Sequence, residues 1–182
     1  MPSICASRVI HLICCQPFPS VGNNTYLTFF QWRSCTVFLN GLTRLYRLTC
    51  PLTGILTMPL LFRMLYGCGL RISEALALLK SDVDLKDGVL HIRHGKNDRE
   101  RIVPMSVSLT EECRKYAQAV HKGTADSIPF FYAKEWTPYS KSAIGKFFRG
   151  ILWDVGIPYR GKQLGPRVHD IRYTFCCHNI QK

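Results

Sequence analysis

An apolar segment of thirteen residues, ILTMPLLFRMLYG at 55–67, constrains the fold of this chain more than any other feature. Wound into a helix, it places apolar side chains on nearly every face, and its closing glycine suits a helix C-terminus. A helix of this kind has to be covered by the rest of the protein. Arg63 interrupts the segment, and the chain has no run of about 18 apolar residues that would predict a membrane span.

The residues that follow predict a second helix and a β-hairpin. RISEALALL at 71–79 places its apolar side chains at helical spacing. VLHIR at 89–93 and RIVPM at 101–105 have the composition of paired strands, and the polar residues 94–100 form the loop between them. Pro104 suits an edge strand, where its missing N–H costs no ladder bond.

Three further helices are predicted from end signals and spacing. Ser108 and Glu111 form a capping box that starts one helix. Thr137, followed by proline, starts another, which ends before Gly156. A last helix begins near His169. We therefore predict an α+β fold that is mainly helical and contains one small antiparallel sheet.

The composition favours a polyanion as a partner. The chain has 182 residues, with 24 Lys and Arg against 12 Asp and Glu, a net charge of +12 and a pI near 9.5. This balance is typical of proteins that bind nucleic acid or an anionic membrane surface. Because 47% of the residues are apolar, we expect a packed core rather than wholesale disorder. Charge alone is equally compatible with a basic protein that has no such partner.

The first part of the chain differs in composition from the rest. Residues 1–60 contain four Arg but no Lys, Asp or Glu, and they hold five of the nine Cys. Surfaces and helix N-termini normally use carboxylates. We therefore predict a boundary near residue 55. An atypical, Cys-rich and acid-free segment at 1–54, which we interpret as foreign sequence fused to a genuine domain, precedes a domain at 55–182.

The cysteines do not predict a metal site. None of them has C-x-x-C spacing, so we expect reduced thiols in a cytoplasmic protein and no metal or other cofactor. The one alternative is a metalloprotein that uses Cys176, Cys177 and His178, but adjacent ligands have poor geometry for a single zinc ion.

Four basic side chains lie at the ends of expected elements. Arg71 follows a Gly-x-Gly turn and opens a helix, Lys96 lies in the hairpin loop, and His169 and Arg172 share a helix face at i, i+3. Arginines bind phosphate bidentately, whereas a lysine acts as a point charge and a proton donor. Four such donors on one phosphate would stabilise a pentacoordinate transition state without a metal. Each residue alone also fits a surface, capping or structural role, and Arg172 could simply pair with a carboxylate such as Glu74 or Asp170.

These residues lie in a pattern that resembles a known family. YGCGLRISEALALLKSDVDLKDGVLHIRHGKNDRERIVPM at 66–105, followed by GPRVHDIRYTF at 165–175, resembles the catalytic domain of the tyrosine recombinases, the phage integrase family. The resemblance covers roughly residues 55–182. It comprises a G-L-R-x-S-E helix start, a G-K hairpin before an R-x-V-P strand, and an H-x-x-R-x-T-F helix, in this order.

The resemblance implies a role for each of these side chains. Arg71 and Arg172 would clamp the scissile phosphate, and His169 would donate a hydrogen bond and assist proton transfer. Lys96 would protonate the leaving 5′-hydroxyl, and Glu74 would help to hold the site. The family breaks and rejoins DNA through a 3′-phosphotyrosine and needs neither ATP nor a metal. Such a protein would belong to DNA integration or site-specific recombination in a mobile element or an integrated phage.

Two departures from the family's pattern bear on activity. The nucleophilic tyrosine of the family follows the H-x-x-R helix, and the chain ends at Lys182 before such a residue. Tyr173 directly follows Arg172 and points about 100° away from it on a helix, so we do not assign it as the nucleophile. We therefore expect a truncated catalytic domain that is inactive alone. The second departure is residues 1–54, which do not resemble the helical DNA-clamping domain that usually precedes the catalytic one.

The expected partner is double-stranded DNA, with other recombinase protomers as candidates to supply the tyrosine in trans. We expect DNA contacts from basic residues outside the predicted core stripe and in the basic loop before the last helix. They are Lys141, Lys146, Arg149, Arg160, Lys162 and Arg167. The alternative is a non-catalytic DNA-binding or regulatory remnant of a mobile element. Either protein would be cytoplasmic and associated with the nucleoid when bound to DNA.

Overall fold

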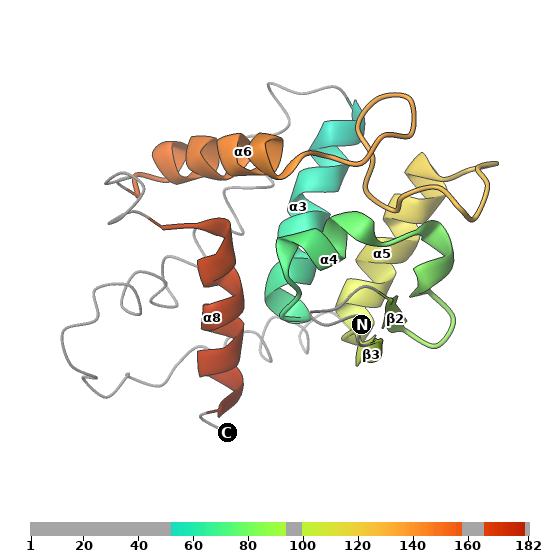
Figure 1. Cartoon of the computed structure of the whole chain (residues 1–182), viewed down its shortest axis with the longest axis horizontal. Helices are drawn as coiled ribbons and strands as arrows, with labels where there is room; N and C mark the ends of the chain where they lie inside the picture. Colours follow the sequence, from blue (N-terminus) through green and yellow to red (C-terminus); the bar gives the residue numbers. More distant parts are fainter. Residues whose placement is uncertain (1–51, 94–99, 158–165, 181–182) are drawn as a thin grey trace, which may run out of the picture.

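The computed structural model describes residues 52–93, 100–157 and 166–180. A long helix, α3 (Leu52–Gly67), forms the centre of this part of the chain, with α5 (Val107–Val120) on one side and α8 (Val168–Ile180) on the other (Figure 1). Most of the α3 side chains that the structure describes are buried, including Met58, Leu61 and Phe62. The prediction of an enclosed helix that ends at Gly67 is confirmed.

The chain leaves α3 through a tight turn at Gly69. Its φ of +58° lies in the left-handed region, which glycine adopts without steric cost. A Cβ atom here would lie 2.3 Å from the ring of Phe175 on α8. The missing side chain therefore allows α8 to pack against the turn that joins α3 to α4 (Ile72–Ala77).

Helix α4 is shorter than the predicted 71–79. It ends at Ala77 because Leu78 is extended, with φ −60° and ψ 128°, and Leu79 pairs with Pro129 in an isolated bridge. A single 3-10 turn, η1 (Lys80–Asp82), then leads into the sheet. Ala75 and Leu76 of α4 are buried as the helical spacing predicted.

The sheet is antiparallel with the strand order β1-β2-β3. The strands β2 (Val89–Ile92) and β3 (Arg101–Pro104) confirm the predicted hairpin, and Pro104 lies on an edge strand as expected. The two-residue strand β1 (Val83–Asp84) extends the sheet and was not predicted. The register pairs Ile92 with Arg101 across the hairpin.

Two predicted helix starts are wrong. Helix α5 is capped by Ser106, whose hydroxyl accepts the N–H of Leu109 at 3.3 Å, and not by Ser108. Helix α6 (Lys141–Asp154) is capped by Ser140 and not by Thr137. The reason for the second error is that Pro138 forms an isolated bridge with Tyr132, which holds it in extended conformation.

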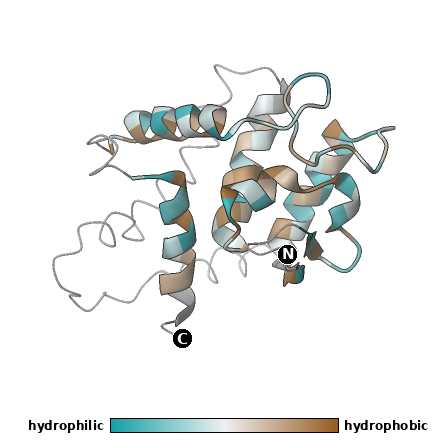
Figure 2. Cartoon of the chain, in the orientation of Figure 1, coloured by the Kyte–Doolittle hydropathy of each residue, from teal (hydrophilic) through white to brown (hydrophobic). Residues whose placement is uncertain are grey.

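The hydrophobic core joins α3, the sheet, α5, α6 and α8. Along α6 the predicted stripe is buried at Ile144, Phe148, Ile151 and Leu152, and Figure 2 shows hydrophilic residues alternating with this stripe around the helix. Gly156, with a φ of +72°, ends α6 as predicted. The observed architecture confirms a mainly helical α+β fold with one small antiparallel sheet.

A search of the described residues finds no helix that is long and apolar enough to cross a membrane. Most of the segment 1–54 lies outside the described residues, so the boundary near residue 55 stays a prediction.

Candidate functional site

The carboxylate of Glu74 is the centre of the candidate site. Its side chain is only 2% exposed, in the first turn of α4. Oε1 accepts hydrogen bonds from Arg71 Nη1 at 2.8 Å and from Arg101 Nη1 at 3.1 Å. Oε2 accepts the backbone N–H of Arg71 at 2.8 Å and Arg101 Nη2 at 2.7 Å. These four bonds use all of the lone-pair positions of the carboxylate.

The pKa of Glu74 shows that this carboxylate is ionised. Burial alone raises the pKa, but the hydrogen bonds from Arg101 and Arg71 and the charge of Arg101 outweigh it and lower the pKa to about 2. Arg172 also comes near, with Nη1 3.7 Å from Oε2. Three guanidinium groups thus surround one carboxylate, and the site keeps an excess of two positive charges.

Arg172 reaches the site from α8. Its Nη1 donates to the carbonyl oxygen of Gly69 at 2.7 Å, which ties α8 to the turn before α4. The side chains of Arg71 and Arg172 are 33% and 27% exposed, so both remain accessible to a ligand. The structure therefore brings together three residues that the sequence singled out, namely Arg71, Glu74 and Arg172, although Arg172 lies far from the other two along the chain.

His169 lies one helical turn before Arg172 on α8 and is exposed. Its ring lies 5.1 Å from that of Tyr173, centroid to centroid, at an angle of 45°. Asp170 accepts the backbone N–H of Arg167 at 2.7 Å, and this bond holds the first turn of α8 that carries the histidine. Lys96, the fourth predicted catalytic residue, lies outside the described residues.

Arg101 is part of the site, and sequence reasoning missed it. It begins β3, directly after the hairpin loop, and its side chain is 35% exposed. The alternation of side chains in the strand could have indicated it. Arg101 and Val103 are two residues apart and share one face of the strand, and Val103 packs against the core. A charged side chain on the face that packs on the core needs a buried counter-ion. Glu74 is that counter-ion.

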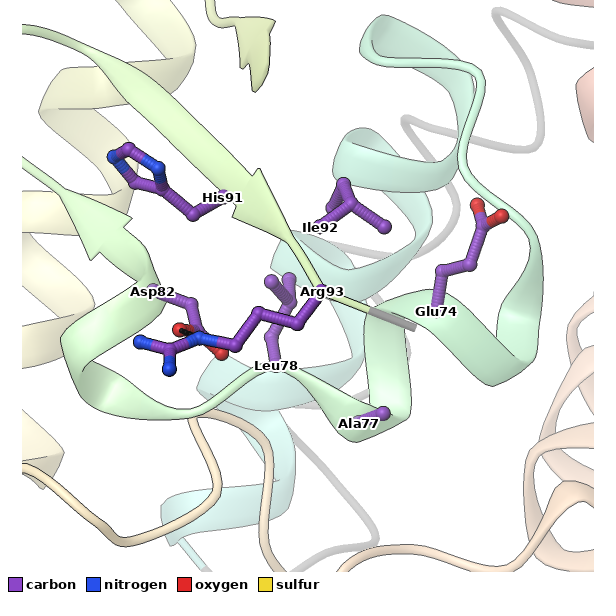
Figure 3. Close-up of a pocket in the computed structure, with 7 residues that line it drawn as sticks. All are labelled: Glu74, Ala77, Leu78, Asp82, His91, Ile92 and Arg93. Atoms are coloured by element: carbon purple, nitrogen blue, oxygen red, sulfur yellow. Dashed lines mark hydrogen bonds and ion pairs between the residues drawn. The ribbon is translucent and has the colours of Figure 1, made fainter. Parts of the chain in front are cut away.

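A second buried carboxylate lies next to this cluster. Asp82 Oδ1 accepts Arg93 Nε at 2.6 Å, and Asp82 Oδ2 accepts the N–H of Leu79 at 3.0 Å. Asp82 and Arg93 line a small pocket with Glu74 and Ile92, and Figure 3 shows Arg93 extended over Asp82, with Glu74 away from this pair. The end of β2 and the start of β3 are thus each anchored by an arginine on a different buried carboxylate.

The predicted DNA contacts fall in two groups. Lys141, Lys146 and Arg149 are exposed on α6, away from its buried stripe, and Arg167 is exposed immediately before α8. Arg160 and Lys162 lie outside the described residues. Of the predicted DNA contacts that the structure describes, three therefore lie along α6 and one, Arg167, lies at the start of α8.

The cysteines that the structure describes are free thiols. Cys68 and Cys113 are buried, and burial raises the pKa of each to about 12. Cys176 and Cys177 are half-buried on α8, and the side chain of His178 lies outside the described residues. Within the described part, no group of three or more His, Cys, Asp or Glu side chains is arranged to hold a metal ion.

In chemical terms, the site is suited to a phosphate monoanion or a phosphodiester. The partly exposed guanidinium groups of Arg71 and Arg172 offer donors in planar forks, which match phosphate oxygens better than a lysine does. Their positions are fixed by Glu74 and by the Gly69 carbonyl before any ligand arrives. Preorganised donors of this kind stabilise charge that develops on a reacting phosphate.

Comparison with known proteins identifies the family. Residues 43–182 match the family model of the phage integrase family. Over 125 residues the chain is 43% identical to the tyrosine recombinase XerA of Thermococcus kodakarensis, which covers 68% of this chain and 41% of that protein. It is 33% identical over 119 residues to the tyrosine recombinase XerC of Rhodospirillum centenum, covering 65% of this chain and 33% of that protein.

Solved structures share the fold. A crystal structure of XerA recombinase superposes with a TM-score of 0.68 at 20% identity, covering 92% of this chain and 53% of that one. A lambda integrase dimer bound to a COC′ core site gives a TM-score of 0.57 at 15% identity, covering 80% of this chain and 49% of the other. The chain spans well under half the length of the curated relatives named above.

Proposed function

We propose that this chain, which belongs to the phage integrase family of tyrosine recombinases, binds double-stranded DNA and clamps one backbone phosphate between Arg71 and Arg172. The observation that carries the proposal is the excess of positive charge around Glu74, with all three of the surrounding arginine side chains partly exposed. Lambda integrase and XerH are bound to DNA in their crystal structures, and this supports DNA as the ligand.

The residues of the site have separate roles in the proposal. Arg71 and Arg172 donate to the non-bridging oxygens of the scissile phosphate, and His169 donates from the first turn of α8. In strand cleavage, a tyrosine supplied by a second protomer attacks phosphorus and gives up its hydroxyl proton to solvent. The bond to the 5′-oxygen breaks, and that oxygen takes a proton from Lys96 as it leaves. The new phosphotyrosine bond conserves the energy of the old one, so the resealing step needs no external energy source.

Tyr173 is not assigned as the attacking group. It is 55% exposed and its ring lies against His169, the side chain that it would have to leave free for the phosphate. We propose that a second protomer is a partner in any strand exchange. A lambda integrase dimer and a lambda integrase tetramer are among the similar structures, which supports such an assembly.

The second part of the proposal concerns DNA affinity. The exposed cations Lys141, Lys146 and Arg149 on α6, with Arg167 before α8, would contact phosphates that flank the clamped one. Such contacts release counter-ions and make affinity fall steeply with salt. We propose that a chain with this DNA-binding role acts in the cytoplasm, in association with the nucleoid.

The test is DNA binding by the full chain, measured by fluorescence anisotropy on a labelled duplex at several salt concentrations. We expect Arg71→Ala and Arg172→Ala each to weaken binding and to lower the salt slope by about one. Arg114→Ala is the matched control, because Arg114 on α5 bonds to Glu111 and to the carbonyl of Leu85 rather than to Glu74.

The alternative function predicts a different pattern. A non-catalytic regulatory remnant that binds DNA through other basic surfaces would keep its affinity and its salt slope in Arg71→Ala and Arg172→Ala. That result would refute the phosphate clamp while leaving DNA binding in place. Salt-independent binding by the unmodified chain would refute DNA binding through the basic surface altogether.

A further inference from the structure

The hydrogen bonds from Arg71 and Arg101 use the full acceptor capacity of Glu74, which leaves none for Arg172. Arg71 and Arg101 together make four hydrogen bonds to its two oxygens, at 2.7 to 3.1 Å. A carboxylate has about four lone-pair positions, so no further donor can be accommodated at full strength. Arg172 accordingly lies 3.7 Å from Oε2 and donates to the Gly69 carbonyl instead.

Arg101 makes the difference in this arrangement. It contributes two of the four bonds, one to each oxygen, in the parallel geometry that is strongest for a guanidinium and a carboxylate. Without it, Oε2 would keep only the backbone N–H of Arg71, and the guanidinium of Arg172 would need to move by about 1 Å to become a full ion pair with Glu74. A guanidinium in that pair would offer fewer donors to a ligand.

We infer that Arg101 is a positioning residue, which together with Arg71 saturates Glu74 so that the guanidinium group of Arg172 stays available for a phosphate. The inference rests on the proposed function, since it assumes that Arg71 and Arg172 bind phosphate. Arg101 also supplies charge, because with Arg101 present the cluster has an excess of two positive charges and without it an excess of one.

The position of Arg101 fits this role. It begins β3 and pairs with Ile92 in the sheet, so its main chain is fixed by the β2–β3 ladder. Arg93, just past the end of β2, is tied to Asp82 at 2.6 Å and makes no bond to Glu74 among the interactions recorded for the described residues. The two arginines therefore anchor the same hairpin, and only one of them controls the carboxylate of the site.

This pair gives a matched experiment on the full chain. We expect Arg101→Gln to weaken binding of inorganic phosphate, followed by NMR, by about tenfold, the scale of one lost hydrogen bond to a charged group. Arg93→Gln, which removes an equivalent anchor from the same hairpin, should change phosphate binding less than about twofold. Equal losses in the two variants would show that Arg101 acts only by holding the hairpin, and would overturn the inference.

A conservative variant separates positioning from charge. Arg101→Lys keeps the positive charge but cannot make two parallel bonds to Glu74. We expect it to bind phosphate clearly more weakly than the unmodified chain, whereas affinity equal to the unmodified chain would mean that Arg101 contributes charge alone. A direct phosphate contact by Arg101 would be exposed by Glu74→Gln, because the Arg101→Gln loss would then persist in that background, contrary to the inference.

A spectroscopic measurement covers the case in which the Glu74 variant does not fold. The backbone amide of Arg71 donates to Glu74 and reports its protonation in a pH titration. The midpoint should rise in Arg101→Gln and stay unchanged in Arg93→Gln, and an unchanged midpoint in both would contradict the inference. If Arg71→Ala leaves phosphate binding intact, both the proposed function and this inference fail. If Arg71→Ala weakens phosphate binding but the Arg101 variants bind phosphate as the unmodified chain does, only this inference fails.

Discussion

Replacing Glu74 by Gln tests whether this carboxylate organises the site. Its pKa is lowered from an ordinary 4.5 to about 2. Each unit of difference between the pKa in the folded state and the pKa in the unfolded state corresponds to about 1.4 kcal/mol. Ionised Glu74 therefore stabilises the folded state by about 3 kcal/mol at neutral pH. Removal of one partner from a buried ion pair typically costs about 3–5 kcal/mol, which agrees in size.

The sign of the pH dependence follows from the lowered pKa. The contribution of Glu74 is fully present above the unfolded pKa of about 4.5, and it is lost as the pH falls toward 2. The stability difference between the unmodified chain and Glu74→Gln should therefore be about 3 kcal/mol at pH 7 and shrink steadily below pH 4.5. Urea unfolding, followed by circular dichroism at a series of pH values, measures both quantities.

Glu112→Gln is the control for this experiment. Glu112 forms ion pairs with Arg63 and Lys115, but its side chain is 43% exposed. Exposed pairs contribute at most about 1 kcal/mol, so this variant should lose little stability. A Glu74→Gln variant that loses no more than the control, or whose loss is the same at pH 3 and pH 7, would refute the reasoning.

Three further predictions concern packing and thiol chemistry. Gly69→Ala should lose about 1–3 kcal/mol more than Gly123→Ala in thermal unfolding, because both glycines have a positive φ but only the first would place a Cβ against an α8 ring. Equal losses would contradict the docking of α8. Tyr116→Phe should cost about 1 kcal/mol in urea unfolding, since its hydroxyl donates to a buried carbonyl at 3.2 Å; no loss would contradict this bond. At pH 8 a thiol reagent should label Cys176 and spare Cys113, because burial raises the pKa of Cys113 to about 12. Mass spectrometry measures the labelling, and a labelled Cys113 would contradict this prediction.

The parts of the fold that could be predicted are those that local sequence determines. The apolar segment at 55–67 predicted α3 because no surface helix carries such a pattern. The alternation in 89–93 and 101–105 predicted β2 and β3, since side chains in a strand alternate between faces. Arg71, Glu74 and Arg172 were singled out from element ends and from the resemblance, and the structure places them together.

The errors come from tertiary context. Thr137 and Pro138 have the residue types of a helix start, but the bridge between Pro138 and Tyr132 holds them outside α6. Arg101 was missed because its partner lies 27 residues away on another element. A charged residue on the inner face of a strand indicates that a buried counter-ion exists, but the sequence alone does not identify it.

The most direct test of the phosphate clamp is an NMR titration of the full chain with a short DNA duplex. The account predicts that the backbone amides of Arg71, His169 and Arg172 shift together on DNA addition, and that excess inorganic phosphate reverses these shifts. DNA binding that moves only the amides of α6, and leaves Arg71 and Arg172 unchanged, would contradict the account.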